Sequence, residues 1–217
     1  MSLLNNGIQT CIICGNQVET KHVLSNVTIN YTDLDTRPRG IARNSEKNCV
    51  HYCPNCGYAS YNLEKDITFG LREILKTEEY QAVFNNQDLD VDAKKFYLMG
   101  IILDEINEFQ RAATSFLRAS WFFNDLGNKE WMIKSKKRAI KSFLKSEFTW
   151  RNEQVICILV DLYRRIEKFD MAVEAINHFG LNNVKNEENR KILEFQLKLC
   201  EEKDSSIHST NEIIQEQ

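Results

Sequence analysis

The sequence predicts a mainly α-helical protein with a small β segment at its N-terminus, and two observations predict it. Both prolines, Pro38 and Pro54, lie in the first 60 residues, where turn-forming residues and period-two alternation also occur. After Ser60, apolar residues recur with the period of a helix, and no proline interrupts the chain again. We therefore expect a β domain over residues 1–60, a helical domain over residues 61–203 and a flexible polar tail over residues 204–217.

The composition is that of a soluble globular protein. Of the 217 residues, 42% are hydrophobic and 27% are charged, and no apolar run is as long as a membrane span. The first residues show neither the basic region nor the long apolar stretch of a secretion signal. A net charge of −3 argues against a grip on nucleic acid by the protein as a whole. We expect a cytoplasmic protein that does not enter a membrane.

Four of the seven cysteines form two Cys-x-x-Cys knuckles. They are Cys11 with Cys14 and Cys53 with Cys56, and each pair is followed directly by glycine. Such a turn lets two thiolates converge on one ion, and the glycine permits the positive φ that brings backbone N–H groups toward sulfur. The two knuckles predict a closed four-cysteine site for structural Zn²⁺ in a reducing compartment. A redox dithiol is the alternative, but such a motif usually stands alone before a helix.

The region around the knuckles has the pattern of short strands. Apolar and polar residues alternate over residues 22–32, which predicts one strand, and a second short strand is expected over Val50–Tyr52. The polar residues from Asp33 to Lys47 are expected to form a loop. The sheet would be too small to be stable alone, so metal binding and folding should be coupled.

Helical periodicity predicts the elements that follow. Asn62 is expected to cap a helix in which Ile67, Leu71, Ile74 and Leu75 share one face, and Asn85 and Asn86 to end it. Further helices are expected at about 92–106, 109–125, 129–148, 152–166, 169–179 and 187–203.

One pattern occurs twice in the helical region and resembles tetratricopeptide repeats. The first copy contains Phe96, Met99, Gly100 and Leu103, then Ala112, Phe116 and Ala119; the second contains Ile156, Leu159, Val160 and Tyr163, then Ala172, Ile176 and Phe179. Small residues let paired helices approach, while large residues fill the space between pairs. The expected fold class is thus mainly α, a small β zinc-ribbon-like segment followed by a tetratricopeptide-like antiparallel helical array. A generic antiparallel bundle is the alternative.

Three motifs together resemble a known family. They are Asp33-Leu-Asp35, then Cys53-Pro-Asn-Cys56-Gly-Tyr-Ala59 before a helix, then the stretch from Arg111 to Gly127 that contains Trp121-Phe-Phe-Asn-Asp-Leu-Gly. The chain resembles a family of uncharacterised bacterial proteins with an N-terminal zinc-ribbon-like segment and tetratricopeptide-like helices. The resemblance implies the fold, the metal site and a bacterial source, and it implies no activity.

Other residues near the knuckles offer further chemistry. Cys49 and His51 could replace a ligand, although four cysteines already complete the site. Asp33 and Asp35, with His51 near in sequence, could hold a second ion in a metal-dependent enzyme, or could simply cap turns and pair with neighbouring arginines.

Cys157 and Cys200 lie in apolar helical stretches and are expected to be buried.

The helix at residues 129–151 is locally basic. Lys134, Arg138, Lys141 and Lys145 share one face, which could contact phosphate or could be an ordinary solvated surface.

The favoured function is a non-enzymatic interaction module, in which a helical groove holds a protein or peptide and Asn107, Arg111 and Lys141 could contact it. Two alternatives are nucleic-acid binding through the ribbon and residues 129–151, and an enzyme that uses Asp33, Asp35 and His51.

Overall fold

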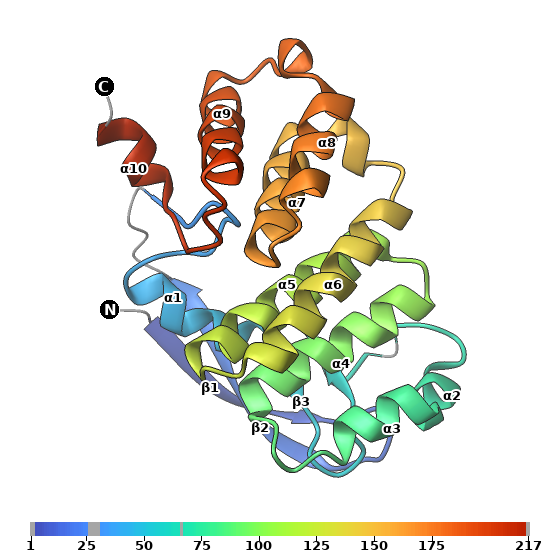
Figure 1. Ribbon diagram of the computed structural model, residues 1–217. Helices are drawn as coiled ribbons and strands as arrows, with labels where there is room; N and C mark the ends of the chain where they lie inside the picture. The colour runs from blue at the N-terminus through green and yellow to red at the C-terminus, as the bar shows by residue number, and fades with distance from the viewer. Residues whose placement is uncertain (1–2, 26–30, 66, 216–217) are drawn as a thin grey trace. The chain divides into compact units, whose positions relative to one another are not determined.

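The computed structural model describes residues 3–25, 31–65 and 67–215 (Figure 1). The fold is mainly α, as predicted, with two small two-stranded sheets in the N-terminal part of the chain. The chain divides into two units, the first formed by residues 1–27 and 44–142 and the second by residues 28–43 and 143–217. Both units combine separate stretches of sequence. The division into domains over residues 1–60, 61–203 and 204–217, which the sequence analysis expects, stays a prediction.

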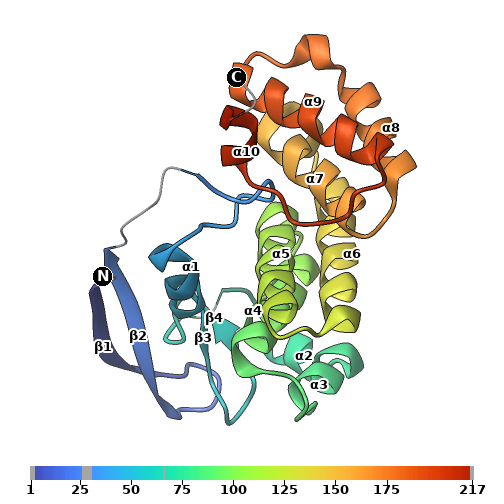
Figure 2. The same cartoon turned by 60° about the vertical axis from the view of Figure 1, so that its left-hand side comes forward.

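The sheets of the first unit are built around the two knuckles. Strand β1 (Leu3–Thr10) pairs antiparallel with β2 (Gln17–Ser25), and the register joins Thr10 to Gln17, so the first knuckle connects the strands (Figure 2). Strand β3 (His51–Tyr52) pairs with β4 (Ala59–Ser60), and the second knuckle connects this pair. Each Cys-x-x-Cys motif therefore lies in the turn of a hairpin.

The sequence analysis located these strands only in part. The short strand expected at residues 50–52 is confirmed by β3. The strand expected over residues 22–32 was placed too late, because β2 begins at Gln17; residues 26–30 of that prediction lie outside the described residues. β1 was missed. The expected loop between Asp33 and Lys47 ends in helix α1 (Ile41–Ser45), which is followed by a 3-10 helix, η1 (Glu46–Cys49).

The first helix that the periodicity predicts after residue 60 begins later than expected. Asn62 does not start a helix. Its side-chain oxygen accepts a hydrogen bond from the backbone N–H of Glu64 at 2.9 Å, but the residues that follow form a local turn. Helix α2 (Leu71–Lys76) follows Gly70, and α3 (Glu78–Phe84) ends just before Asn85, as expected. The longer helices α4 (Val91–Glu105), α5 (Phe109–Asp125) and α6 (Lys129–Lys145) lie where periodicity predicts them.

Helices α4 and α5 pack closely because of one small residue. Gly100 of α4 lies against Phe116 of α5, and a Cβ at this glycine would be 2.7 Å from the ring. Phe116 is fully buried and meets the ring of Tyr97 edge-to-face at 5.1 Å. A small residue thus lies against a large one between these two helices, while their assignment to a tetratricopeptide-like repeat stays a prediction.

The second knuckle is attached to α3 of the same unit. The hydroxyl of Tyr80, which is fully buried, donates a hydrogen bond to the carbonyl of Gly57 at 2.9 Å. A Cβ at Gly57 would be 2.7 Å from the ring of Phe84, and the glycine has a φ of 81°. At Gly15, the equivalent glycine of the first knuckle, φ is 74° and no atom lies within 4 Å of such a Cβ. The two glycines therefore differ mainly in the contact with the helix.

The second unit is also helical. Helices α7 (Glu153–Arg165) and α8 (Phe169–Phe179) form the antiparallel pair at the second copy of the repeat pattern, and α9 (Glu187–Glu201) packs on both. Two short 3-10 helices, η2 (Thr149–Arg151) and η3 (Leu181–Asn183), complete the connections. Asn152 and Asn186 cap α7 and α9 by accepting hydrogen bonds from backbone N–H groups in their first turns.

Part of the polar tail expected over residues 204–217 forms secondary structure, and its flexibility stays a prediction. Helix α10 (Thr210–Gln215) forms there, and Asp33 and Ser209 make an antiparallel bridge. The physical reason is Arg164 of α7, which is fully buried. Its guanidinium donates to the carbonyls of Asp204 and Ser206 at 2.7 and 2.9 Å and to the carboxylate of Asp161 at 2.6 Å. The polar composition of residues 204–217 gave no indication that they contact Arg164.

The two knuckle glycines provide a matched test of the contact with α3. In Gly15→Ala, the positive φ alone should cost about 1–2 kcal/mol. In Gly57→Ala, overlap with Phe84 adds a packing cost, so we expect a total of about 2–5 kcal/mol. Urea unfolding of both variants measures this difference. Equal destabilisation would contradict a close contact between the knuckle and α3.

Arg164→Met should destabilise the second unit by about 3–5 kcal/mol, because it leaves a buried carboxylate and two carbonyls without their donor. Lys168→Met, in the same unit and exposed, should change stability by no more than about 0.5 kcal/mol. Denaturant unfolding measures both values, and hydrogen exchange of residues 204–210 should rise only in Arg164→Met. Unchanged protection of that segment would show that the guanidinium does not hold it.

Candidate metal centre

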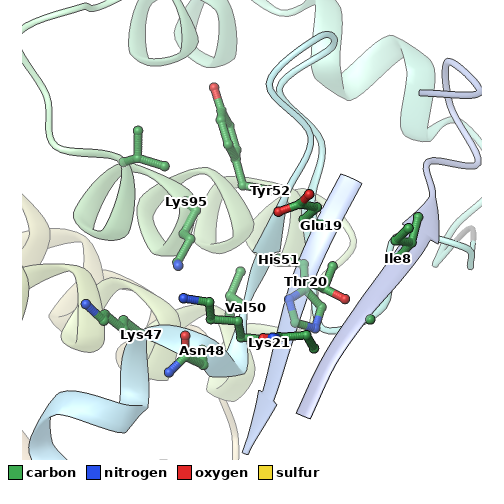
Figure 3. A pocket seen from close by; sticks show the side chains of 13 residues that line it. Ile8, Glu19, Thr20, Lys21, Lys47, Asn48, Val50, His51, Tyr52 and Lys95 are labelled. Atoms are coloured by element: carbon green, nitrogen blue, oxygen red, sulfur yellow. The ribbon is translucent and has the colours of Figure 1, made fainter. Parts of the chain in front are cut away.

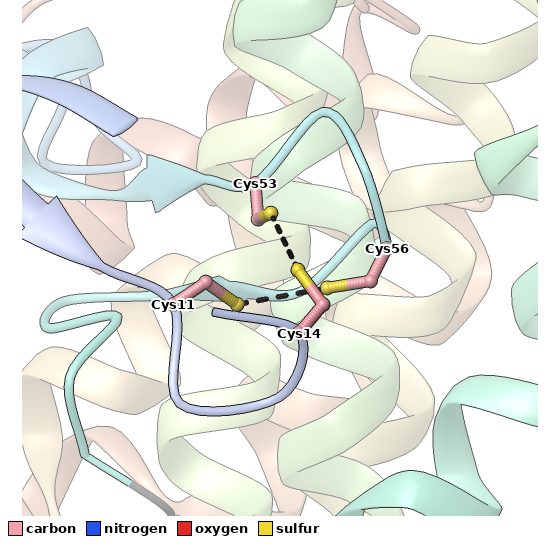
Figure 4. A group of neighbouring side chains, drawn as sticks. All are labelled: Cys11, Cys14, Cys53 and Cys56. Carbon is pink, nitrogen blue, oxygen red and sulfur yellow. Dashed lines mark hydrogen bonds between the residues drawn. The ribbon is translucent and has the colours of Figure 1, made fainter. Parts of the chain in front are cut away.

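The four knuckle cysteines converge on one point in the first unit. The Cys11 and Cys56 sulfurs are 3.6 Å apart, and those of Cys14 and Cys53 are 3.5 Å apart (Figure 4). All four Sγ atoms lie within 4.8 Å of one another. Each close pair takes one sulfur from each knuckle, so the two hairpin turns face each other across the cluster.

The backbones of the two knuckles repeat the same hydrogen bonds. The N–H of Cys11 donates to the carbonyl of Asn16 at 2.9 Å, and the N–H of Cys53 donates to the carbonyl five residues later, that of Tyr58, at 2.8 Å. Each glycine N–H donates to the carbonyl of the first cysteine of its motif, at 2.8 Å for Gly15 and 2.9 Å for Gly57. The repeated geometry follows from the shared spacing of two cysteines and a glycine.

This arrangement has the dimensions of a tetrahedral metal site. Four sulfurs at about 2.3 Å from a central zinc ion would be about 3.8 Å from one another, close to the separations of 3.5 and 3.6 Å. The cysteines can therefore hold a metal ion. Among the residues that the structure describes, no second group of three or more Cys, His, Asp or Glu side chains is close enough to do so.

The surroundings shift the acidity of the thiols in opposite directions. Burial raises the pKa of Cys11 and raises that of Cys56 further. At Cys14 burial also acts to raise the pKa, but hydrogen bonds from the Asn55 side chain and the Asn16 backbone outweigh it and lower the pKa to about 7. At neutral pH, Cys14 therefore forms a thiolate more readily than Cys11 or Cys56 does.

Sequence analysis missed two polar residues at this cluster. The Asn16 side chain donates to the Cys53 sulfur at 3.9 Å, and Asn55 bonds Cys14. Both asparagines lie inside or just after a knuckle, where their side chains can reach a sulfur. A signal existed in the sequence, since each knuckle has an asparagine within two residues of a cysteine.

The other three cysteines lie outside the cluster. Cys157 and Cys200 are buried, as expected, and burial raises the pKa of Cys157 to about 12. Cys49 is half-buried, and burial raises the pKa of its thiol as well. Neither Cys49 nor His51 belongs to the group of four sulfurs.

The contacts of Asp33 and Asp35 favour turn formation and arginine pairing over a second ion. Asp33 accepts hydrogen bonds from Arg39 at 2.5 Å and from Arg43 at 3.4 Å, and Asp35 accepts one from the backbone N–H of Arg37. Both carboxylates are buried with these partners, which is the turn-and-arginine alternative of the sequence analysis. No group of metal-ligand side chains that includes Asp33, Asp35 or His51 is found in the described part of the chain.

His51 has a different environment. Its ring is buried and meets the ring of His22 edge-to-face, with 4.7 Å between centroids. Burial, with the charges of His22 and Lys95, lowers the pKa of His51 to about 4.

The basic face of α6 is less regular than predicted. Arg138 is paired with Glu79 and lies 3.6 Å from a carboxylate oxygen of Asp104. Lys134 is exposed and stacks over the ring of Trp131 at 4.0 Å. Lys136, a further basic residue of this helix, is buried. The helix thus presents exposed lysines, but two of its cations are used inside the first unit.

The three candidate groove residues all lie at the surface of the first unit. Asn107 has a φ of 63° in the turn between α4 and α5, and Arg111 lies 3.8 Å from a carboxylate oxygen of Glu108. Lys141 is exposed on α6. Contact with a partner at these positions stays a prediction.

In the described part of the chain, no helix is both long and apolar enough to cross a membrane.

Comparison with known proteins supports the family resemblance. No curated protein and no solved structure matches the chain. Residues 4–200 match the model of a family described as "Uncharacterized protein conserved in bacteria (DUF2225)". Because the match covers most of the sequence, the protein belongs to this conserved bacterial family.

Proposed function

We propose that the protein is a zinc-stabilised interaction module of the reducing bacterial cytoplasm. The convergence of four cysteine sulfurs at tetrahedral spacing is the observation that supports it most strongly. In this proposal Cys11, Cys14, Cys53 and Cys56 bind one structural Zn²⁺, and the helices present the surface that a partner recognises.

The chemistry of the donors favours zinc in a structural role. Thiolates are soft ligands that prefer Zn²⁺ over Mg²⁺ or Ca²⁺, and four of them fill its tetrahedral coordination. A filled coordination sphere has no position for water or substrate, so the ion would stabilise the hairpins rather than catalyse a reaction. The small size of the two sheets supports this role, because two-stranded sheets are marginal alone.

The helical part supports recognition of a protein or peptide segment. The α4–α5 pair and the α7–α8 pair occupy the two copies of the repeat pattern, each joined by a short turn. In tetratricopeptide-like arrays, side chains on one face of such pairs contact an extended partner. Arg111 of α5 and Lys141 of α6 are exposed and cationic, which suits a partner segment that carries acidic residues.

The zinc proposal predicts one Zn²⁺ per chain and four thiols that react only after chelation or unfolding. Cys14→Ser removes one ligand, so it should lower zinc affinity by at least about tenfold and lower the free energy of unfolding. Cys49→Ser, near the second knuckle but outside the cluster, is the matched control and should retain one zinc. Metal content by mass spectrometry and a thiol titration with and without chelator measure these outcomes. Equal zinc loss in the two variants would overturn the assigned ligand set.

The interaction proposal predicts that charge reversal on the helices weakens one defined complex. Arg111→Glu and Lys141→Glu should each reduce recovery of the same crosslinked partner by about tenfold, because each converts attraction to repulsion. Lys76→Glu, at an exposed position of α2, should leave the recovery of the partner unchanged. Quantitative mass spectrometry after crosslinking in cells measures recovery with full-length protein. If all three variants recover the partner equally, these helices are not the binding surface.

A further inference from the structure

A cavity of about 650 Å³ lies in the first unit, beside β3 (Figure 3). Residues of β1, β2, η1, β3 and the first turns of α4 line it, so elements far apart in sequence contribute to one site. Its volume falls within the range of about 300–1,000 Å³ that is usual for small-molecule sites. The four cysteines do not line it, and none of the residues proposed for partner contact does.

The cavity is lined by three lysines from three elements. Lys21 comes from β2, Lys47 from η1 and Lys95 from α4, and Figure 3 shows all three beside the cavity. Glu19 is the single acidic residue among those that line it. Asp92 lies 2.7 Å from the Lys95 amino group and 3.9 Å from that of Lys47, so one carboxylate is shared between two ammonium groups. With both acids counted, the local charge is still positive.

Lys95 is the most buried of the three lysines. Only 8% of its surface is exposed, and its ion pair with Asp92 offsets part of the cost of burying the ammonium group. The His51 ring is also buried and lines the same cavity as Lys95. No hydrogen bond to the His51 ring nitrogens is found among the described residues, so the single N–H of the neutral ring can donate to a ligand. The Asn48 side chain adds an amide beside them.

Apolar side chains also line the cavity, beside polar ones such as Asn6 and Thr20. Val50 is buried, whereas Ile8 and Val91 are 66% and 50% exposed. These side chains can cover a hydrocarbon or aromatic group while the lysines hold an anion. A ligand that fits would therefore have a charged end and an apolar body.

We propose that this cavity binds a small organic phosphate. Three separate ammonium groups can each meet one of the three terminal oxygens of a phosphate monoester. A planar carboxylate is better matched by the forked guanidinium of arginine, and no arginine is among the residues that line the cavity. His51 and Asn48 would provide neutral hydrogen bonds, and Ile8 with Val91 would cover the organic group. The inference does not depend on the proposed interaction function.

Phenyl phosphate is a suitable probe, because it combines the anion with an apolar ring. Isothermal titration of the full-length, zinc-loaded protein should show saturable binding at one site, and amide signals of Val50 and His51 should shift in nuclear magnetic resonance spectra. Lys21→Met and Lys95→Met should each weaken binding by about tenfold, as expected when one hydrogen bond to a charged group is lost. Lys76→Met, on α2 and outside the cavity, should bind like the wild type.

The outcomes separate the proposal from its alternatives. Lys21 is exposed, so Lys21→Met keeps the test valid even if Lys95→Met disturbs folding, which circular dichroism would reveal. Tighter binding of benzoate than of phenyl phosphate would assign the site to carboxylates and overturn the phosphate. Binding of benzyl alcohol as tight as that of phenyl phosphate would show that the anion contributes nothing. No saturation at millimolar phenyl phosphate, or equal loss in Lys76→Met, would overturn the site.

Discussion

The convergence of four thiols is the constraint on which the N-terminal part of the structure depends. β1 ends at Thr10 and β3 ends at Tyr52, each one residue before a cysteine, so the position of the cluster determines where both hairpins turn. A two-stranded sheet has too little buried surface to be stable by itself. Bringing the two turns together with one ion would compensate for that deficit. The Gly57 contacts with Tyr80 and Phe84 then join this small β region to α3.

In the second unit, the buried guanidinium of Arg164 holds separate segments of the chain together. Arg164 joins the carboxylate of Asp161 to the backbone carbonyls of residues 204 and 206. Beyond these residues, Leu34 donates its backbone N–H to the carbonyl of His208, and Asp33 is held by Arg39 and Arg43. The Asp33 carboxylate is thus part of the scaffold. Its burial beside two guanidinium groups gives an acidic residue that resembles a metal ligand in the sequence a structural role.

The sequence predicted features that depend on local patterns and missed those that depend on distant contacts. The four cysteines and the helices from residue 91 onward were predictable, because ligand spacing, helical period and caps such as Asn152 are local. β1 lacks clear alternation, since Asn5, Asn6 and Gly7 follow two leucines. The tail is attached by a hydrogen bond from Arg164 to the carbonyl of Asp204, forty residues later in the sequence. No local sequence pattern encodes such a contact. The cavity was missed for the same reason, because its three lysines come from three elements.

The proposed zinc and the proposed phosphate would be linked thermodynamically. Ile8 on β1 and His51 on β3 line the cavity and lie three and two residues before a cysteine. An ion that fixes the two knuckles also fixes the strands that carry these side chains, so it reduces the ordering cost that a ligand of the cavity must overcome. Coupling of this kind is reciprocal, so a bound phosphate must raise the affinity for zinc by the same factor. A structural ion in this fold would then also determine how strongly a separate site binds its ligand.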